Sequence, residues 1–364
     1  YNIDGYIIPK NDEFFSEYAA NDRLKTISNF SGSAGYSIIL EKKNYLFVDG
    51  RYTIQAKKEA GKNFQIMDLH KIINCNLFKN LSIGFDPKFF TSIQIKKFFY
   101  KNNKVKSIES NLIDQIHKDK VKSSKPFFSL KNEIVGEDYK SKIMKIRKYL
   151  NKNKSDYLFI TAPENVAWLL NIRGHDNPNS PIPNCQLIMD NKKSFYLISS
   201  KDKVSKLINE KKIKSDQLIE PKNFNKFISN LKGKKIIVDK NTCSIFFENI
   251  LKKKFKILSI VDPIYSLKSL KNKTEIKNML NAHIFDGVAL TKFIYWIKNI
   301  NKKKITEFDA QNKLENFRKR NKSYLYPSFN TIAGAGGNGA IVHYRATKKN
   351  TKKINKKDIF LCDS

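Results

Sequence analysis

The stretch SIILEKKNYLFV, residues 37–48, contains two apolar runs separated by a short polar segment. Both runs are rich in the β-branched and aromatic residues that favour strands, and a connection of this length is typical of a hairpin. The stretch therefore predicts a β-hairpin. Outward from it we expect a strand at 5–9, a helix at 51–60 and a strand ending at 83–87. Strands that alternate with helices are typical of an α/β layer, in which helices pack on a sheet.

The middle of the chain repeats this order of elements. The segment Leu169-Leu170-Asn171-Ile172-Arg173-Gly174 stands where Ile27-Ser28-Asn29-Phe30-Ser31-Gly32 stands in the first third. We interpret the two segments as equivalent parts of a duplicated α/β unit. The elements expected in the second unit are helices at 138–150 and 165–171, a hairpin from 186–189 and 195–198, and strands at 156–160, 235–239 and 255–258.

The last third of the chain predicts two helices followed by strands. Apolar residues recur at helical spacing over 273–300, which indicates a long amphipathic helix. A second helix is expected over 306–320, because Thr306 and Asp309 suit the start of a helix. Strands at 328–344 and 359–363 would then form a helix-backed sheet.

Polar and proline-containing segments suggest where the domains divide. The segment 122–126 is polar and ends in proline, as linkers often do. The chain begins with Tyr1, and its last apolar strand has no later segment to pair with, so we expect that the chain is cut at both ends. The predicted domains are 1–125, 126–265 and 266–364.

The charge balance is strongly basic. The chain has 69 Lys plus Arg against 34 Asp plus Glu, a net charge of +35, and such an excess can indicate a nucleic-acid-binding protein. However, lysine is spread along the whole chain, whereas arginine, whose planar fork suits phosphates and bases, is rare. We interpret the lysines as solvated surface and expect only weak, salt-sensitive binding to polyanions. The arginines are Arg23, Arg51, Arg147, Arg173, Arg318, Arg320 and Arg345.

Several other protein classes are disfavoured. No apolar run approaches the ~18 residues of a membrane-spanning helix, and residues 1–10 lack the basic start and apolar stretch of a secretory signal. The cysteines are far apart and form no CxxC motif, which argues against a disulfide framework or a structural zinc site and favours a reducing cytoplasm. They are Cys75, Cys185, Cys243 and Cys362.

The glycine-rich segment 334–339 matches the pattern G-x-G-x-x-G. In a dinucleotide site these glycines would join a strand to a helix that holds the pyrophosphate. Here the run 340–344 that follows is strand-like, and no acidic residue stands in the expected later strand. We therefore reject a dinucleotide site and expect a flexible turn between two strands.

Two polar residues stand out near the end of the chain. His343 lies in the apolar run 340–344, where a single histidine is most often a hydrogen-bonded core residue. Asp363 follows the apolar residues 359–361, and a carboxylate at the end of a buried strand is costly unless it is paired, hydrogen-bonded or bound to metal. The residues alone leave both a structural and a functional role open.

Taken together, these stretches resemble the aminopeptidase P family, the Xaa-Pro aminopeptidases with a pita-bread catalytic domain, and in particular its long three-domain branch. The resemblance covers nearly the whole chain, in order. It implies an α/β fold with two tandem creatinase-N-terminal-like (ribonuclease-H-like) domains, followed by the incomplete start of a pita-bread α+β domain. The stretches include 6–9, 16–18, 30–35, 49–52, 167–174, 271–275, 282–283, 331–332, 339–344 and 363–364, with Asp286 and 288–290.

The resemblance also implies roles for particular residues. His343 resembles the family histidine that contacts the substrate near the scissile carbonyl and helps to stabilise the transition state. Asp363 resembles the first carboxylate ligand of a centre of two divalent metal ions, usually manganese, whose bridging water attacks the bond before proline. Arg51 resembles an N-terminal-domain arginine that contacts the peptide. We expect the Asp363 carboxylate to be sheltered from solvent and His343 to lie on the same face of the sheet.

The family pattern requires further metal ligands beyond Asp363, which the given sequence does not contain. The resemblance therefore implies a fragment that is inactive alone, because ligand number is decisive for a metal site. For the full-length parent it implies a cytoplasmic homodimer that acts on peptides with proline at the second position. No membrane and no specific nucleic acid is expected as a partner.

Other functions remain as alternatives. The chain could belong to a non-catalytic relative of the same fold that binds peptides or proteins, or, with less support, to a basic nucleic-acid-associated protein. Xaa-Pro dipeptidases and creatine-hydrolysing enzymes share the catalytic fold, but the long N-terminal region favours an aminopeptidase.

Overall fold

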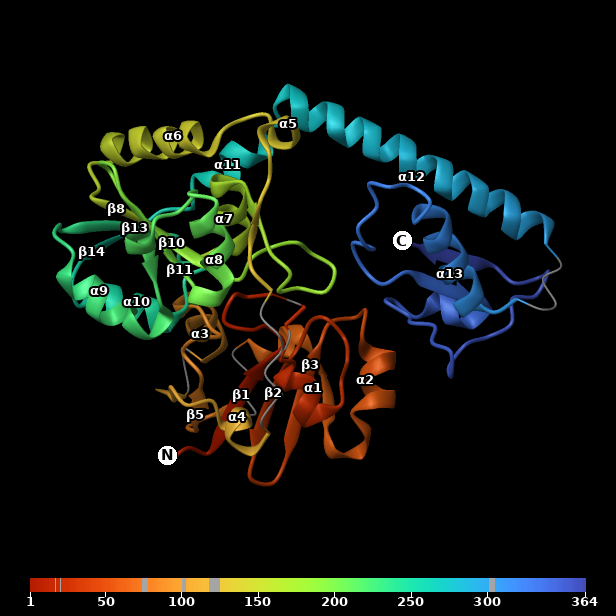
Figure 1. Ribbon diagram of the computed structural model, residues 1–364. Helices are drawn as coiled ribbons and strands as arrows, with labels where there is room; N and C mark the ends of the chain where they lie inside the picture. Colours follow the sequence, from red (N-terminus) through yellow and green to blue (C-terminus); the bar gives the residue numbers. More distant parts are fainter. Residues whose placement is uncertain (17, 20, 74–77, 100–102, 118–124, 301–304) are drawn as a thin grey trace. The chain divides into compact units, whose positions relative to one another are not determined.

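The computed structural model describes residues 1–16, 18–19, 21–73, 78–99, 103–117, 125–300 and 305–364. These residues form two compact units, Tyr1–Lys271 and Asn272–Ser364 (Figure 1). The boundary between the units lies close to the predicted third domain, whereas the predicted division at 125 and 126 falls inside the first unit. The three-domain division stays a prediction.

The first unit begins with a six-stranded sheet in the order β4-β3-β2-β1-β5-β6. The predicted hairpin is present as β2 and β3, with Ile38 opposite Tyr45. β1 and β2 are also antiparallel, and the other neighbouring strands are parallel. The strands are β1 Gly5–Pro9, β2 Tyr36–Leu40, β3 Asn44–Val48, β4 Gln65–Asp68, β5 Ser82–Phe85 and β6 Lys104–Ser107.

A second six-stranded sheet in the first unit has the order β12-β11-β10-β8-β13-β14. Its pattern of parallel and antiparallel neighbours is the same as in the first sheet, position by position. The predicted duplication is therefore confirmed at the level of topology. The strands are β8 Tyr157–Ile160, β10 Gln186–Asp190, β11 Phe195–Ile198, β12 Leu218–Ile219, β13 Lys235–Val238 and β14 Lys256–Ser259.

Helices cover both faces of the two sheets, so the central strands are buried on both sides (Figure 1). This explains why central strands such as β1 and β8 are mostly apolar and do not alternate with polar residues. The helices are α1 Arg23–Ser28, α2 Thr53–Glu59, α3 Ser92–Phe99, α4 Leu112–Ile116, α5 Asn132–Val135, α6 Tyr139–Lys152, α7 Pro163–Leu170, α8 Lys201–Asn209, α9 Phe224–Asn230, α10 Ile245–Lys252 and α11 Ile264–Ser269.

The equivalent segments recognised in the sequence occupy equivalent places in the two repeats. Asn29 ends α1 and Asn171 ends α7, and both have left-handed backbones, with φ of 60° and 52°. Asparagine is one of the few residues other than glycine that tolerate this conformation, and it is common just after a helix.

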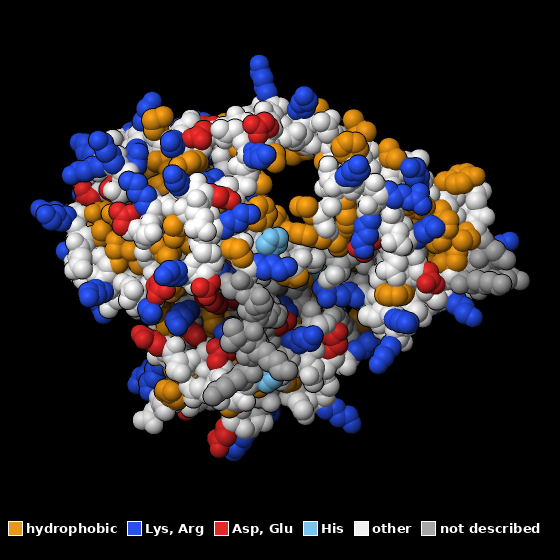
Figure 2. Space-filling model, in the orientation of Figure 1, with side chains coloured by type: hydrophobic (Ala, Val, Ile, Leu, Met, Phe, Trp, Pro, Cys, Tyr) orange, Lys and Arg blue, Asp and Glu red, His pale blue; other side chains and the backbone are white. Residues whose placement is uncertain are grey.

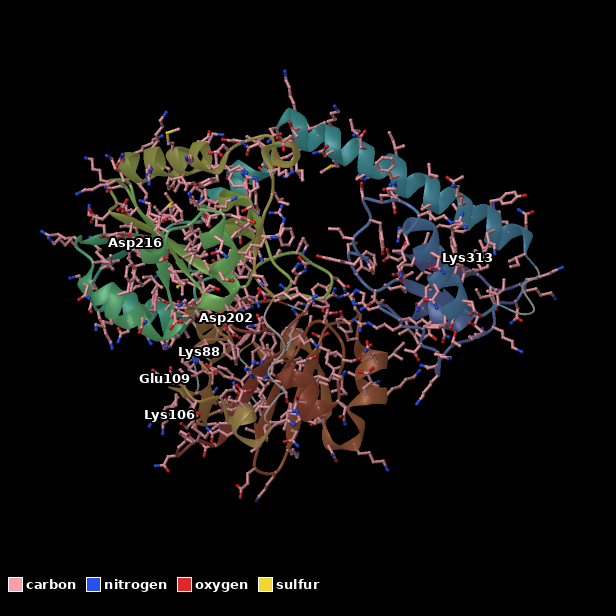
Figure 3. All side chains as sticks on the ribbon, viewed as in Figure 1. Lys88, Lys106, Glu109, Asp202, Asp216 and Lys313 are labelled. Carbon is pink, nitrogen blue, oxygen red and sulfur yellow. The ribbon has the colours of Figure 1, made fainter. Side chains whose placement is uncertain are left out.

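The two repeats touch through equivalent loops. Thr91, just before α3, forms an antiparallel bridge with Ser244, just before α10. The Ile245 amide donates to the Phe90 carbonyl at 2.9 Å. The ammonium of Lys88, which Figure 3 labels, lies 5.3 Å from the centre of the Phe246 ring. The loops that precede α3 and α10 therefore form one part of the junction, and the Ser16 hydroxyl adds a bond to the Asn177 side chain at 3.1 Å.

The described residues of the second unit include the helices α12 and α13, a short 3-10 helix and a two-stranded ribbon. α12 covers Lys273–Asn299 and α13 covers Glu307–Arg318, and each begins with a capping box, Asn272 with Glu275 and Thr306 with Asp309. The strands β15, Ile332–Ala335, and β16, Phe360–Asp363, are antiparallel. Their core residues on one face, including Ala335, Phe360 and Cys362, pack with residues of the two helices.

Two strand predictions near the end of the chain need correction. The strand expected over 328–344 is confined to β15, because a 3-10 helix follows at Gly336–Ala340 and His343 lies in a turn. The glycines allow this fold-back: a Cβ on Gly334 would lie 2.8 Å from the Gly339 nitrogen. The strand expected at 359–363 is present, but it is alternately half-buried and exposed, because only one face packs on the helices.

The surface agrees with the interpretation of the lysines. On the face shown in Figure 2, Lys and Arg side chains are spread over the molecule and do not gather in one patch. No helix in the described parts of the chain is long and apolar enough to cross a bilayer. Residues Glu17 and Cys75 and most of the predicted linker at 122–126 lie outside the described residues.

Candidate active site

The ribbon of the second unit places Asp363 and the segment around His343 on the same face. Asp363 lies directly opposite Ile332 in the β15–β16 pair, and opposite residues of an antiparallel pair point to the same face. Ile332 packs with Tyr344 and Ala346. The loop that carries His343 therefore packs on Ile332 at the face to which Asp363 belongs, and the place of the His343 side chain beside Asp363 stays a prediction.

The shelter expected for the Asp363 carboxylate is absent, because Asp363 is exposed. The alternation along β16 explains this. The neighbouring Cys362 turns into the core, where burial raises the pKa of its thiol to about 11. Asp363 is consequently turned to the outer face, where it is accessible to a ligand or ion.

His343 is a partly exposed turn residue and not the strand residue that the sequence suggested. Its φ of 60° lies in the left-handed region, which costs a residue with a Cβ about 1 kcal/mol. A tight turn fixes the backbone here, since the Tyr344 amide donates to the Ile341 carbonyl at 3.1 Å. The common role of a lone histidine as a core residue is therefore excluded for His343.

A residue that the sequence analysis did not single out lies at the centre of this region. Glu307, the first residue of α13, is fully buried at 0% exposure. Its carboxylate accepts hydrogen bonds from the Ala335 amide at 2.7 Å, the Asn338 side chain at 3.0 Å, the Tyr344 hydroxyl at 2.9 Å and the Lys352 amide at 2.8 Å. Burial, together with the bond to Glu307, raises the pKa of Tyr344 to about 12.

The only sequence signal for Glu307 is its place in the first turn of a helix. Acidic residues are common there because they complement the helix dipole. Such residues are usually exposed, and the four donors come from positions 28 to 45 residues later. The role of Glu307 therefore depends on the fold of the loop, which the sequence pattern did not reveal.

Arg51 belongs to the first unit and lies just before α2. Its guanidinium forms a two-point contact with Asp49, at 3.0 and 2.8 Å, and lies 5.1 Å from the centre of the Tyr52 ring. The side chain remains 49% exposed. Since His343 and Asp363 belong to the other unit, a role for Arg51 beside them stays a prediction.

A hollow of about 360 Å³ in the second unit is lined by residues of α12, the end of α13 and the segment that follows α13. Arg318 and Asp286 line it and form a two-point ion pair between α13 and α12, at 2.6 and 3.0 Å. Arg318 also reaches the Ser364 carbonyl at 3.4 Å. Its other lining residues are Ala282, Phe285, Asn321, Ser323, Tyr324, Leu325 and Tyr326.

The described residues do not by themselves fit a centre of two metal ions. Among them, no group of three or more His, Cys, Asp or Glu side chains lies close enough together to hold an ion. Asp363 supplies one hard oxygen donor of the kind that manganese and magnesium prefer. A single carboxylate is too few, since the number of ligands is the first requirement of a metal site.

Family models match most of the chain. Residues 117–275 match the Creatinase/Prolidase N-terminal domain, and residues 277–364 match Metallopeptidase family M24. These matches agree with the predicted fold class, in which creatinase-like α/β domains precede the start of a pita-bread domain.

Individual proteins match the chain over its whole length. The Xaa-Pro aminopeptidase ApepP of Drosophila melanogaster is 31% identical over 389 residues, covering 100% of this chain and 62% of that protein. Xaa-Pro aminopeptidase 1 of Dictyostelium discoideum is 30% identical, with coverage of 100% and 62%. The chain thus spans about three fifths of the length of the curated relatives it matches.

A solved structure confirms the fold. The X-prolyl aminopeptidase from Caenorhabditis elegans, described as a cytosolic enzyme with a di-nuclear active site, superposes with a TM-score of 0.88. The match covers 99% of this chain and 63% of that chain, at 24% sequence identity.

Proposed function

The chain belongs to the Xaa-Pro aminopeptidase family, and from this premise we propose that its protein is a metal-dependent aminopeptidase that removes an N-terminal residue preceding proline. The observation that carries the proposal is the similarity to Xaa-Pro aminopeptidases over 100% of the chain. The face shared by Asp363 and the His343 loop supports it.

Each predicted site residue has a defined part in this proposal. His343 contacts the substrate near the scissile carbonyl from a fixed, partly exposed turn. Asp363 contributes one ligand of a centre of two divalent ions, with manganese as the first candidate because its ligand is a hard oxygen. Arg51 contacts the peptide from the first unit. In the proposed division into domains 1–125, 126–265 and 266–364, Arg51 belongs to the first domain and His343 and Asp363 to the third. The whole protein is proposed to be a cytoplasmic homodimer.

The 364-residue chain is proposed to be inactive by itself. Its described residues supply no group of three metal donors, and Asp363 is exposed. The proposed activity therefore belongs to the chain extended to the length of its relatives, with the remaining ligands supplied by the added segment.

The experiment compares the 364-residue chain with the extended protein. The substrate is a short peptide with proline second, and the control peptide has alanine at that position. We expect the extended protein with Mn²⁺ to release the first residue of the proline peptide only, and EDTA to abolish this release. The 364-residue chain should show no cleavage under the same conditions.

A second candidate function is peptide or protein binding without catalysis. Two observations favour it: Asp363 is exposed, and the described residues contain no group of three or more metal donors. If the extended protein binds the proline peptide in calorimetry but cleaves it with none of Mn²⁺, Co²⁺ or Zn²⁺, the binding function replaces the enzymatic one.

A further inference from the structure

We infer that Glu307 is a positioning residue, which holds the loop 335–352 and thereby fixes His343 for its part in the reaction. The inference rests on the proposed function of His343, but its structural part can be tested without enzyme activity. It is carried by the four donors that converge on one buried carboxylate from both sides of His343.

The two oxygens of Glu307 join different parts of the loop. Oε1 accepts from the Ala335 amide at the end of β15, and the Asn338 side chain in the 3-10 helix donates to both oxygens, at 3.0 Å to Oε1 and 3.3 Å to Oε2. Oε2 accepts from the Tyr344 hydroxyl and the Lys352 amide. The backbone adds a further link, because the Glu307 amide donates to the Lys352 carbonyl at 3.0 Å.

The charge of Glu307 is stabilised by neutral donors. Among the described residues, all the groups that donate to it are amides or a hydroxyl. A buried carboxylate is tolerable when hydrogen bonds satisfy its oxygens, and the N-terminus of a helix favours negative charge. Loss of any one donor therefore leaves part of the buried carboxylate without a hydrogen bond, and this weakens the remaining bonds. The cluster is cooperative for this reason.

His343 needs such support. Its left-handed backbone, with φ of 60°, is unfavourable for a residue with a side chain, and such conformations persist only where the surroundings impose them. Tyr344, the next residue, is tied to Glu307 through its hydroxyl at 2.9 Å. The backbone direction at His343 is thus set within one residue of the Glu307 contact.

The test uses Glu307→Gln, which keeps the shape but turns one acceptor oxygen into a donor that faces existing donors. In the 364-residue chain we expect hydrogen exchange at the Ala335 or Lys352 amide to accelerate on the order of tenfold or more. The Ile354 amide is the internal control, because it donates to the Ile305 carbonyl at 2.9 Å and not to Glu307.

The NMR signals of the imidazole rings distinguish a local change at His343 from a general loss of stability. The chain has 5 histidines, and we expect Glu307→Gln to shift or broaden the signals of His343 alone. The other histidines serve as controls: His70, His117, His175 and His283.

A milder pair of variants guards against misfolding. Tyr344→Phe removes one donor to Glu307, whereas Tyr324→Phe removes a buried hydroxyl that has no hydrogen-bond partner among the described residues. We expect the first to change the His343 signals and the second to leave them unchanged. If folded Glu307→Gln and Tyr344→Phe both leave the His343 signals and the Ala335 and Lys352 amides as in the parent, the inference is wrong.

The extended protein separates this inference from the proposed function. If it cleaves the proline peptide, we expect Glu307→Gln to lower kcat at least tenfold with little change in KM. An unchanged kcat in a folded variant would overturn the positioning role. If the parent itself cleaves nothing, the proposed function fails, while the NMR and exchange results still decide whether Glu307 fixes His343.

Discussion

The two sheets of the first unit share one topology but stabilise the polar groups at their ends differently. In the first repeat two charged pairs lie beside the neutral bond from Asn111 to Asp86 at 3.1 Å: Arg23 makes a two-point contact with Asp114 at 2.8 Å, and Lys10 pairs with Asp22. The Arg23 guanidinium also lies 4.5 Å from the centre of the Phe89 ring.

The second repeat uses neutral partners at the corresponding edge. The Asn165 side chain donates to Asp262 at 2.7 Å, and the hydroxyls of Thr161 and Thr242 share a bond of 2.7 Å. The apolar strands kept their order and direction in both repeats, while the polar residues around them diverged. The comparison teaches that apolar register specifies this topology, and that several polar solutions are compatible with it.

The largest expected effect tests whether the two cores are equivalent. Leu46 in β3 and Leu197 in β11 each follow a tyrosine at the same strand position, and both are 0% exposed. We expect Leu46→Ala and Leu197→Ala each to lower the free energy of unfolding by about 3 kcal/mol. Urea denaturation of the chain measures the change.

The control for this prediction is Leu270→Ala, since Leu270 is 79% exposed. It should change the free energy by less than about 0.5 kcal/mol. The losses in free energy of unfolding for Leu46→Ala and Leu197→Ala are then compared. A difference of more than about 2 kcal/mol between them would show that the repeats do not share an equivalent core.

A smaller effect is expected at the two equivalent asparagines. Asn171 is buried, donates to the Glu137 carbonyl at 2.8 Å and accepts from the Lys142 ammonium at 2.7 Å, whereas Asn29 is exposed. Asn171→Ala should therefore cost about 2 kcal/mol, and Asn29→Ala about 1 kcal/mol for the left-handed backbone alone. Thermal and urea unfolding compare the two, with Asn29→Gly expected to be nearly neutral.

The smallest effect concerns pH. Burial raises the pKa of Asp12 in the first repeat and of Asp262 in the second to about 6. The folded state takes up a proton near pH 6, while the unfolded carboxyl stays ionised until about pH 4. The contribution of each carboxyl group to the free energy of unfolding therefore rises by about 1 kcal/mol as the pH falls from 7 to 5. The same contribution is lost when the pH rises again through 6.

Two substitutions distinguish the contribution of Asp12 to this pH dependence from that of Asp262. In Asp12 a single oxygen, Oδ1, accepts from the amides of Phe14 and Ser16, so Asp12→Asn can keep both bonds and should flatten the pH dependence by about 1 kcal/mol. In Asp262 the two oxygens accept from Ile264 and Asn165 separately. Asp262→Asn should therefore lower stability at pH 7. An increase in stability at pH 7 would contradict the predicted difference between Asp12 and Asp262.

The sequence predicted those parts of the fold that depend on local apolar patterns. The stretch 37–48 indicated the β2–β3 hairpin, and the equivalent segments ending at Gly32 and Gly174 indicated the duplication, because both signals lie within a few consecutive residues. The family resemblance also followed from such short strings.

Predictions failed where the structure depends on the way a loop closes. The run 340–344 has the composition of a strand, but the fold-back of Gly336–Ala340 onto β15 makes a turn at His343. The same closure brings four donors to Glu307, which the sequence presents as an ordinary acidic residue at a helix start. The exposure of Asp363 likewise depends on which face of β16 packs on the helices.

The junction between the repeats has a consequence for their origin. Thr91 and Ser244 precede the equivalent helices α3 and α10, and they pair with each other in antiparallel fashion. A contact between the same position in two like units is what a self-associating ancestor would form about a twofold axis. Fusion of two gene copies of such an ancestor would keep the contact between Thr91 and Ser244 within one chain.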